Sequence, residues 1–66
     1  MDALDFIMTY EAGECTANEV VDGFAQLVSS GTAWHLQGSY GRAAAALIER
    51  GFIDRAGNIL RYPEPE

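Results

Sequence analysis

The chain has 66 residues, with ten Asp or Glu, four Arg and no Lys, which give a net charge of −6. A domain of this size buries only about 60% of its unfolded surface, so association with a partner would add useful stability. The single cysteine excludes an internal disulfide and a metal site built on cysteines. No apolar run approaches the length of a membrane-spanning helix and no signal peptide opens the chain. We therefore expect a soluble protein without a membrane partner.

The charges are divided unevenly along the chain. Residues 1–33 contain six acidic residues and no basic one, whereas residues 34–66 balance four Arg against four acidic residues. A nucleic-acid-binding protein normally presents a basic face, so this composition argues against a nucleic-acid partner. The acidic half either keeps a small protein soluble or faces a basic partner, and the sequence leaves both readings open.

The first predicted helix covers residues 3–12, with Asp2 as its N-cap and Gly13 after its last turn. Its apolar residues recur at the spacing of a helix with one buried face, and two further residues widen that face. The first group is Ala3, Phe6, Ile7 and Tyr10, and the widening residues are Leu4 and Met8.

The second predicted helix has a well-defined start and end. Thr16 and Glu19 have the spacing of a capping box, and the helix should end before Gly31. Its buried face comprises Ala17, Val20, Val21, Phe24, Leu27 and Val28, and Gly23 is expected to point away from it. Cys15 is interpreted as a packing residue, because acidic neighbours at a helix start oppose formation of a thiolate.

Residues 32–51 are predicted to form one continuous helix, with Thr32 as N-cap and Gly51 in the left-handed conformation after it. Its apolar side spans more than half of the circumference, which indicates neighbours on several sides or a shared surface. The alternative is a break at Gly38, with Ser39 capping a new helix. The continuous helix is preferred because the break would place Arg42 and Gly41 in a first turn.

After Gly51 the pattern changes to that of a β-hairpin, with residues 52–54 and 59–62 on either side of a Gly-containing turn. The Pro-rich residues 63–66 should form a flexible tail. The predicted fold is therefore mainly α: one domain over residues 1–62, built as a three-helix bundle with a long central third helix and a small C-terminal β-hairpin.

No group of residues has the pattern of a catalytic site. His35 is the only histidine. Ser39, one turn later, could act as a nucleophile with His35 as its base, but no third group is apparent that would orient the imidazole. The segment GSYG lacks the spacing and the lysine of a phosphate-binding loop. We therefore expect neither an enzyme nor a metal or cofactor site.

One edge of the third predicted helix is a candidate binding surface. Gln37 falls among apolar residues, and a buried amide must find a hydrogen-bond partner at a helix end or face a cleft. In the second case small residues form the floor of the cleft and Trp34 and Arg42 its walls, which are residue types enriched at binding hot spots. The candidate residues are Trp34, Gln37, Gly38, Tyr40, Gly41, Arg42 and Ala45. The alternative is that these residues only pack the fold.

The segments YEAGE (10–14), VVDGFAQLVSSG (20–31) and AWHLQGSYGRAAAALIERG (33–51) resemble a family of small uncharacterised proteins from tailed bacteriophages. Members of that family resemble the pattern Y-E-x-G-E followed by W-x-L-Q-G-x-Y-G-R. The resemblance covers about residues 4–53. It implies a phage-encoded accessory protein in the cytoplasm of the infected bacterial host, with no known activity. Its motif residues here are Trp34, Gln37, Gly38, Tyr40, Gly41 and Arg42.

Three functional hypotheses follow. The first is a non-catalytic protein-interaction module that uses the Trp34–Arg42 edge to bind a host protein, a phage protein or a second copy of itself. The second is a winged-helix-like DNA-binding regulator, with Arg55 and Arg61 on the wing and Arg42 and Arg50 on the third helix. The third is a protein that sequesters a small ligand or nucleotide, with Trp34 stacking on it and Arg42 holding its phosphate.

Overall fold

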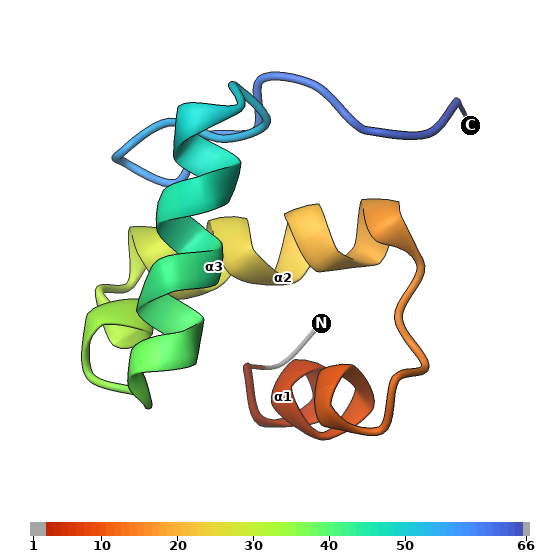
Figure 1. The fold of residues 1–66 in the computed structure, drawn as a ribbon, viewed down its shortest axis with the longest axis vertical. Helices are drawn as coiled ribbons and strands as arrows, with labels where there is room; N and C mark the ends of the chain where they lie inside the picture. The colour runs from red at the N-terminus through yellow and green to blue at the C-terminus, as the bar shows by residue number, and fades with distance from the viewer. Residues whose placement is uncertain (1–2, 66) are drawn as a thin grey trace.

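A computed structural model describes residues 3–65 (Figure 1). The chain forms α1 (Ala3–Glu11), α2 (Ala17–Ser29), a short 3₁₀ helix η1 (Thr32–Trp34) and α3 (Gly38–Glu49). The prediction of a mainly helical chain with three helices is confirmed. The predicted cap of the first helix, Asp2, lies outside the described residues.

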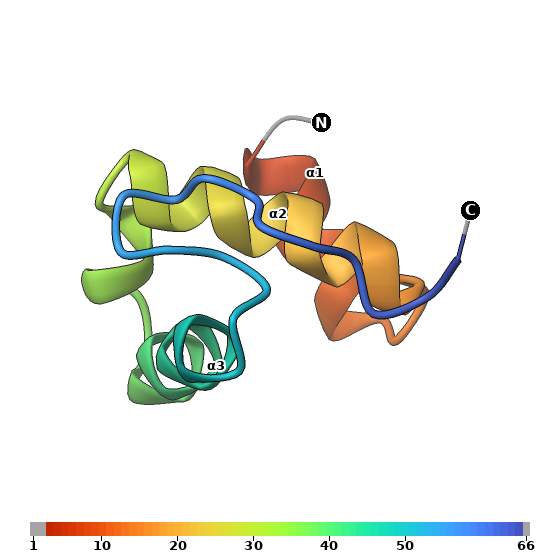
Figure 2. The same cartoon turned by 90° about the horizontal axis from the view of Figure 1, so that it is seen from above.

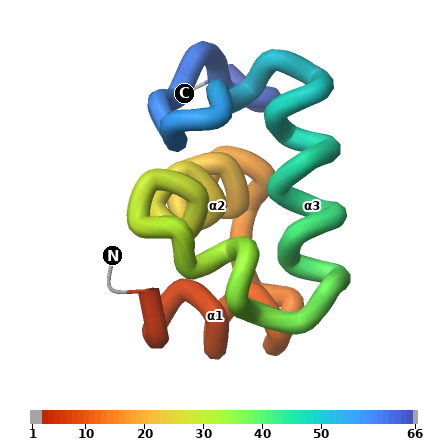
Figure 3. Tube along the Cα trace, turned by 90° about the vertical axis from the view of Figure 1, so that its left-hand side faces the viewer, coloured from red at the N-terminus to blue at the C-terminus, as the bar shows by residue number. Residues whose placement is uncertain are grey.

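Helix α2, rather than α3, is the centre of the fold. Figure 3 shows α2 between α1 on one side and the C-terminal segment on the other, with α3 flanking it. Six residues of α2 are buried, whereas only Tyr40 and Ala44 are buried on α3. The prediction of a central third helix was wrong, because the helix with buried residues on the most sides has to occupy the middle.

The predicted capping box starts α2. The Thr16 hydroxyl oxygen accepts a hydrogen bond from the Glu19 backbone N–H at 3.1 Å, and the Glu19 carboxylate accepts one from the Thr16 N–H at 2.8 Å. Two backbone N–H groups that no helical carbonyl can reach are thereby satisfied. This part of the prediction is confirmed, because a capping box depends only on residues close together in the sequence.

The predicted continuous helix over residues 32–51 was wrong. η1 ends at Trp34, and Gln37 adopts an extended backbone conformation (φ −55°, ψ 150°) as the residue before α3. A helix of twenty residues would be about 30 Å long, which exceeds the longest dimension of the molecule, 25 Å. The break next to Gly38 matches the alternative interpretation, although Gln37 and not Ser39 occupies the cap position.

The end of α3 has Schellman geometry, which includes the predicted left-handed conformation of Gly51. Gly51 has a φ of +79°, the Phe52 N–H donates to the Leu47 carbonyl at 3.0 Å, and the Gly51 N–H donates to the Ile48 carbonyl at 3.1 Å. These bonds satisfy carbonyls at the helix end and turn the chain back towards α2.

The predicted β-hairpin is reduced to one antiparallel bridge between Ile53 and Ile59, and none of residues 3–65 forms a named strand. The Asp54 carboxylate organises the turn instead, since it accepts hydrogen bonds from the Ala56 N–H (2.9 Å) and the Asn58 N–H (2.8 Å). These hydrogen bonds, of which that from the Asn58 backbone has the largest effect, lower the pKa of Asp54. Beyond Ile59 the backbone does not continue a ladder, because the Leu60 and Arg61 N–H groups both donate to the Phe52 carbonyl.

The segment after the bridge crosses α2 on the side away from α1, as Figure 2 shows. Arg61 donates to the Arg50 carbonyl at the end of α3 (2.8 Å) and lies over the Phe52 ring. The Tyr62 hydroxyl bonds Asp22 at 2.6 Å, and Glu64 exchanges two hydrogen bonds of 3.0 Å with Asn18. Residues 61–64 are thus attached to α2 and α3 through side chains. The domain limits and the flexibility of the tail stay predictions.

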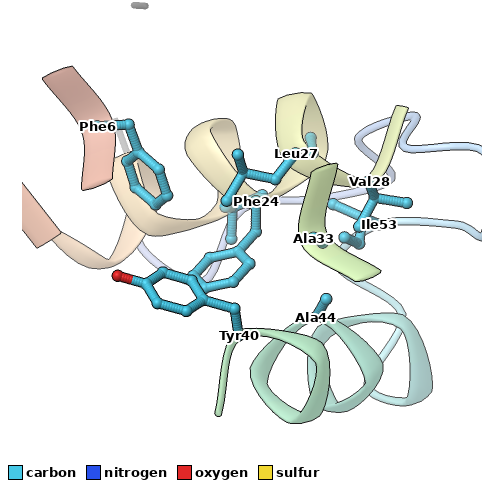
Figure 4. Close-up of a cluster of buried hydrophobic side chains, with 10 residues drawn as sticks. Phe6, Phe24, Leu27, Val28, Ala33, Tyr40, Ala44 and Ile53 are labelled. Atoms are coloured by element: carbon cyan, nitrogen blue, oxygen red, sulfur yellow. The ribbon is translucent and has the colours of Figure 1, made fainter. Parts of the chain in front are cut away.

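The core is an aromatic cluster that joins all three helices (Figure 4). The Phe24 ring of α2 contacts Phe6 of α1 edge-on, with ring centroids 5.5 Å apart, and lies 6.0 Å from Tyr40 of α3. Tyr10 of α1 completes the cluster, 5.7 Å from Tyr40. Such pairs contribute about 0.5–1.5 kcal/mol each beyond the burial of their area. On α1, the predicted contribution of Leu4 and Met8 to this core was wrong, because both side chains are exposed.

The Phe6 ring is fully buried against Gly23, where a side chain would overlap it. The expectation that Gly23 points away from the buried face was therefore wrong. The absence of a side chain at this position allows α1 and α2 to approach closely.

The Tyr40 hydroxyl is buried and has no hydrogen-bond partner in the described part of the chain. Figure 4 shows it directed towards α1. Burial raises the pKa of Tyr40 to about 12, and the Glu11 carboxylate approaches closely enough to add to this rise without reaching hydrogen-bond geometry. The group is therefore a neutral phenol whose polar atom is left unsatisfied, which is unfavourable for folding.

Replacing Gly23 with Ala should destabilise the fold. Overlap with Phe6 should cost about 1–3 kcal/mol, which outweighs the gain of about 1 kcal/mol in helix propensity. Gly41→Ala is the matched control, because its new methyl carbon would stand 3.8 Å from Trp34, an ordinary contact. Urea unfolding followed by circular dichroism should give a lower midpoint for Gly23→Ala and an unchanged or higher one for Gly41→Ala. Equal midpoints would contradict the assigned packing.

Tyr40→Phe should stabilise the protein by about 1 kcal/mol at neutral pH, because it removes a buried hydroxyl without a partner.

The dependence of folding stability on alkaline pH should also differ between the wild type and Tyr40→Phe. An unfolded tyrosine ionises near pH 10, whereas Tyr40 in the folded chain has a pKa of about 12. The wild type should thus lose stability as the pH rises from about 10 towards 12, and the variant should lose less. Unfolding midpoints at neutral pH and at about pH 11 test both points, and a parallel loss in the two proteins would argue against this assignment.

Candidate binding surface

The short helix η1 directs two neighbouring residues to opposite sides. Ala33 is fully buried, whereas the side chain of Trp34 is 52% exposed. On one side the indole ring lies next to Gly41 of α3, where an added methyl carbon would stand 3.8 Å from the ring, an ordinary contact. Trp34 therefore packs on α3 at Gly41 with one side, and about half of the residue stays open to solvent.

An open pocket lies beside this ring. It is lined by Trp34 from η1, by Ala45, Ile48 and Glu49 from α3, and by Arg55 from the turn after α3, and its volume is about 660 Å³. The volume falls within the roughly 300–1,000 Å³ typical of ligand-binding clefts. Trp34, Ala45 and Ile48 are apolar, and Glu49 and Arg55 add one charge of each sign.

The predicted surface is divided by the structure. Trp34 and Ala45 line the pocket, and Gly41 supports the Trp34 ring. Gln37, Gly38 and Arg42 are exposed at the start of α3, where a side chain on Gly38 would stand 3.3 Å from the Arg42 guanidinium. Tyr40 faces the core. The seven residues therefore do not form one continuous edge.

The expectation that Gln37 lies inside the apolar side was wrong. Its side chain is exposed, and it makes no capping hydrogen bond to α3. The prediction that placed Gln37 among apolar residues assumed one continuous helix. Because the helix is broken at this residue, the side chain turns outwards.

Three pocket residues were not among the predicted ones: Ile48, Glu49 and Arg55. Ile48 follows Ala45 by three residues, so helical spacing alone could have added it. Arg55 reaches the pocket only because the turn at residues 54–58 folds back over α2. A side chain at Gly57 in this turn would stand 2.6 Å from the Ser29 nitrogen, which shows how closely the turn packs there.

The other candidate reactive groups are not assembled into a site. His35 and Ser39 are both exposed. Burial, with a contribution from Glu19 and Glu14, raises the pKa of Cys15, in the direction expected for a poorly reactive thiol. Within residues 3–65, no three His, Cys, Asp or Glu side chains are grouped to hold a metal ion.

The helices of the described residues are also too short or too polar to cross a lipid bilayer.

Comparison with known proteins identifies the chain at the level of its family. No curated protein and no solved structure gives a significant match. A family model described as a domain of unknown function, DUF7417, matches residues 2–65, which is nearly the whole chain. The protein therefore belongs to the DUF7417 family of domains of unknown function.

Proposed function

We propose that this protein is a small, non-catalytic interaction module that binds another protein through the pocket beside Trp34. The observation that carries the proposal is the half-exposed indole ring at the edge of an open, mostly apolar pocket. A large aromatic side chain in this position has much apolar area to bury, and tryptophan is among the residues most enriched at interface hot spots. The partner is a host protein, a phage protein or a second copy of the chain.

The proposed setting is the cytoplasm of a bacterium infected by a tailed phage, where an accessory protein of this kind would modulate a host process. It is supported by the resemblance of the Trp34–Arg42 segment to small phage proteins. The surface that we propose differs from the predicted edge. It keeps Trp34 and Ala45 and adds Ile48, Glu49 and Arg55, whereas the other predicted residues do not line it: Gln37, Gly38, Tyr40, Gly41 and Arg42.

The DNA-binding alternative has less support. A winged-helix protein needs a hairpin wing with basic residues free to contact phosphates. The C-terminal segment has only one bridge, and Arg61 already bonds the Arg50 carbonyl and lies on Phe52.

Sequestration of a small ligand or nucleotide is favoured by one observation, the volume of the pocket. In that reading the cation beside Trp34 would be Arg55 rather than Arg42.

The test is affinity capture from host lysate and from lysate of infected cells, with the full chain as bait. Trp34→Ala should lose the captured protein, because hot-spot truncations cost about 2 kcal/mol or more, roughly thirtyfold in affinity. Leu60→Ala is the matched control, since it shortens another large apolar side chain that is 59% exposed outside the pocket. Circular dichroism should first show that both variants are folded. A protein retained equally by all three baits would refute the role of Trp34.

A further inference from the structure

The C-terminal segment follows one face of α2 towards the start of that helix (Figure 2). Three points of the segment meet three residues of α2 in reverse order: Gly57 packs on Ser29, Tyr62 bonds Asp22 and Glu64 bonds Asn18. These α2 residues are four and seven positions apart, so they lie on one face of the helix. The outer face of α2 thus holds a length of peptide that has no regular secondary structure of its own.

The Asn18 side chain binds the backbone of Glu64. Its Nδ2 donates to the Glu64 carbonyl and its Oδ1 accepts from the Glu64 N–H, both at 3.0 Å. The amide thereby satisfies both backbone groups of one residue, and the Glu64 carboxylate takes no part in these two bonds. Every residue except proline offers the same donor and acceptor. Recognition by Asn18 is therefore independent of the side chain at this position.

Two residues earlier, the contact depends on the side chain. The Tyr62 hydroxyl donates to the Asp22 carboxylate at 2.6 Å, and hydrogen bonds to an ionised acceptor are stronger than neutral ones. Pro63 lies between the two contacts, and its ring restricts both its own φ and the conformation of Tyr62. The outer face of α2 therefore selects the pattern Tyr-Pro-x, where x is any residue other than proline.

The attachment of this segment should be easy to open. Residues 58–65 are all exposed, so the segment buries little apolar surface against α2. Segments with few buried contacts open at a small cost in free energy. The Leu60 and Arg61 N–H groups remain bonded to the Phe52 carbonyl, so Tyr62, Pro63 and Glu64 can leave α2 without displacing a helix.

The charge of the segment is not the best match for this face. The charged residues of α2 are Glu19 and Asp22, with no basic residue, and the segment adds the carboxylate of Glu64 beside them. Like charges at an exposed site repel weakly, and salt screens the effect. A neutral or basic residue in the place of Glu64 should bind better. The chain's own segment has the advantage of being tethered, which gives it a high effective concentration.

We propose that the α2 face formed by Asn18 and Asp22 is a second binding site, which takes a Tyr-Pro-x segment of another protein in which x is not acidic. Residues 62–64 of the chain are its autoinhibitory occupant. This site is separate from the Trp34 pocket and does not rest on the proposed function. The apparent affinity for the partner is reduced by the fraction of molecules in which the chain's own segment is bound.

The test is an NMR titration of the ¹⁵N-labelled full chain with a blocked synthetic peptide of residues 61–65 that carries Glu64→Gln. The peptide should shift the backbone resonances of Asn18 and Asp22 and move those of residues 62–64 towards their unstructured positions. Tyr62→Ala in the chain should strengthen peptide binding severalfold, because it loosens the competing segment. The peptide with the natural Glu64 should bind more weakly than the Gln peptide at low salt.

The controls use the chain with Tyr62→Ala. Adding Asn18→Ala should abolish peptide binding, whereas adding Gln37→Ala, which removes an exposed amide at the start of α3, should leave it unchanged. Adding Trp34→Ala should also leave it unchanged, which separates this site from the proposed function. Unshifted Asn18 and Asp22 resonances at millimolar peptide, or peptide binding that survives Asn18→Ala, would overturn the proposal.

Discussion

The packing of the Phe6 ring against Gly23 is the contact on which the rest of the structure depends. It brings α1 close enough to α2 for Tyr10 and Phe24 to meet, and Tyr40 then attaches α3 to the same cluster. Because a core of this size has room for few large side chains, each ring fixes the position of a whole helix. With the inner side of α1 committed to Phe6 and Tyr10, the side chains of Leu4 and Met8 are turned outwards.

The C-terminal segment reaches its place without a β-sheet. The Asp54 carboxylate closes the turn, Gly57 allows that turn to lie on α2, and Arg61 donates a hydrogen bond to the Arg50 carbonyl at the end of α3. These are side-chain interactions at separate points, which is why the backbone pairs only once, between Ile53 and Ile59. The result that matters for the proposed surface is the position of Arg55, which completes the pocket against Trp34 and α3.

The exposed apolar residues follow from the size of the protein. A chain of 66 residues cannot enclose all of its large side chains, and among residues 3–65 the exposed ones lie on α1, on η1, and at and after Ile59 of the bridge. Exposed apolar residues are ordinary when they are scattered, and they indicate an interface when they line a hollow beside charged groups. Trp34 meets that condition, whereas Leu60 does not. This difference is the reason for placing the proposed function at Trp34.

The sequence by itself determined the features that rest on neighbouring residues: three helices, the capping box at Thr16 and Glu19, and the Schellman turn at Gly51. It also singled out Trp34, the only tryptophan, as a candidate. Tertiary structure alone decided that α2 is central, that the segment around Gln37 breaks, and that Arg55 meets Trp34. The physical reason is distance along the chain. Caps and turns are stabilised within a few residues, whereas the break and the pocket depend on the space left by elements that are remote in sequence.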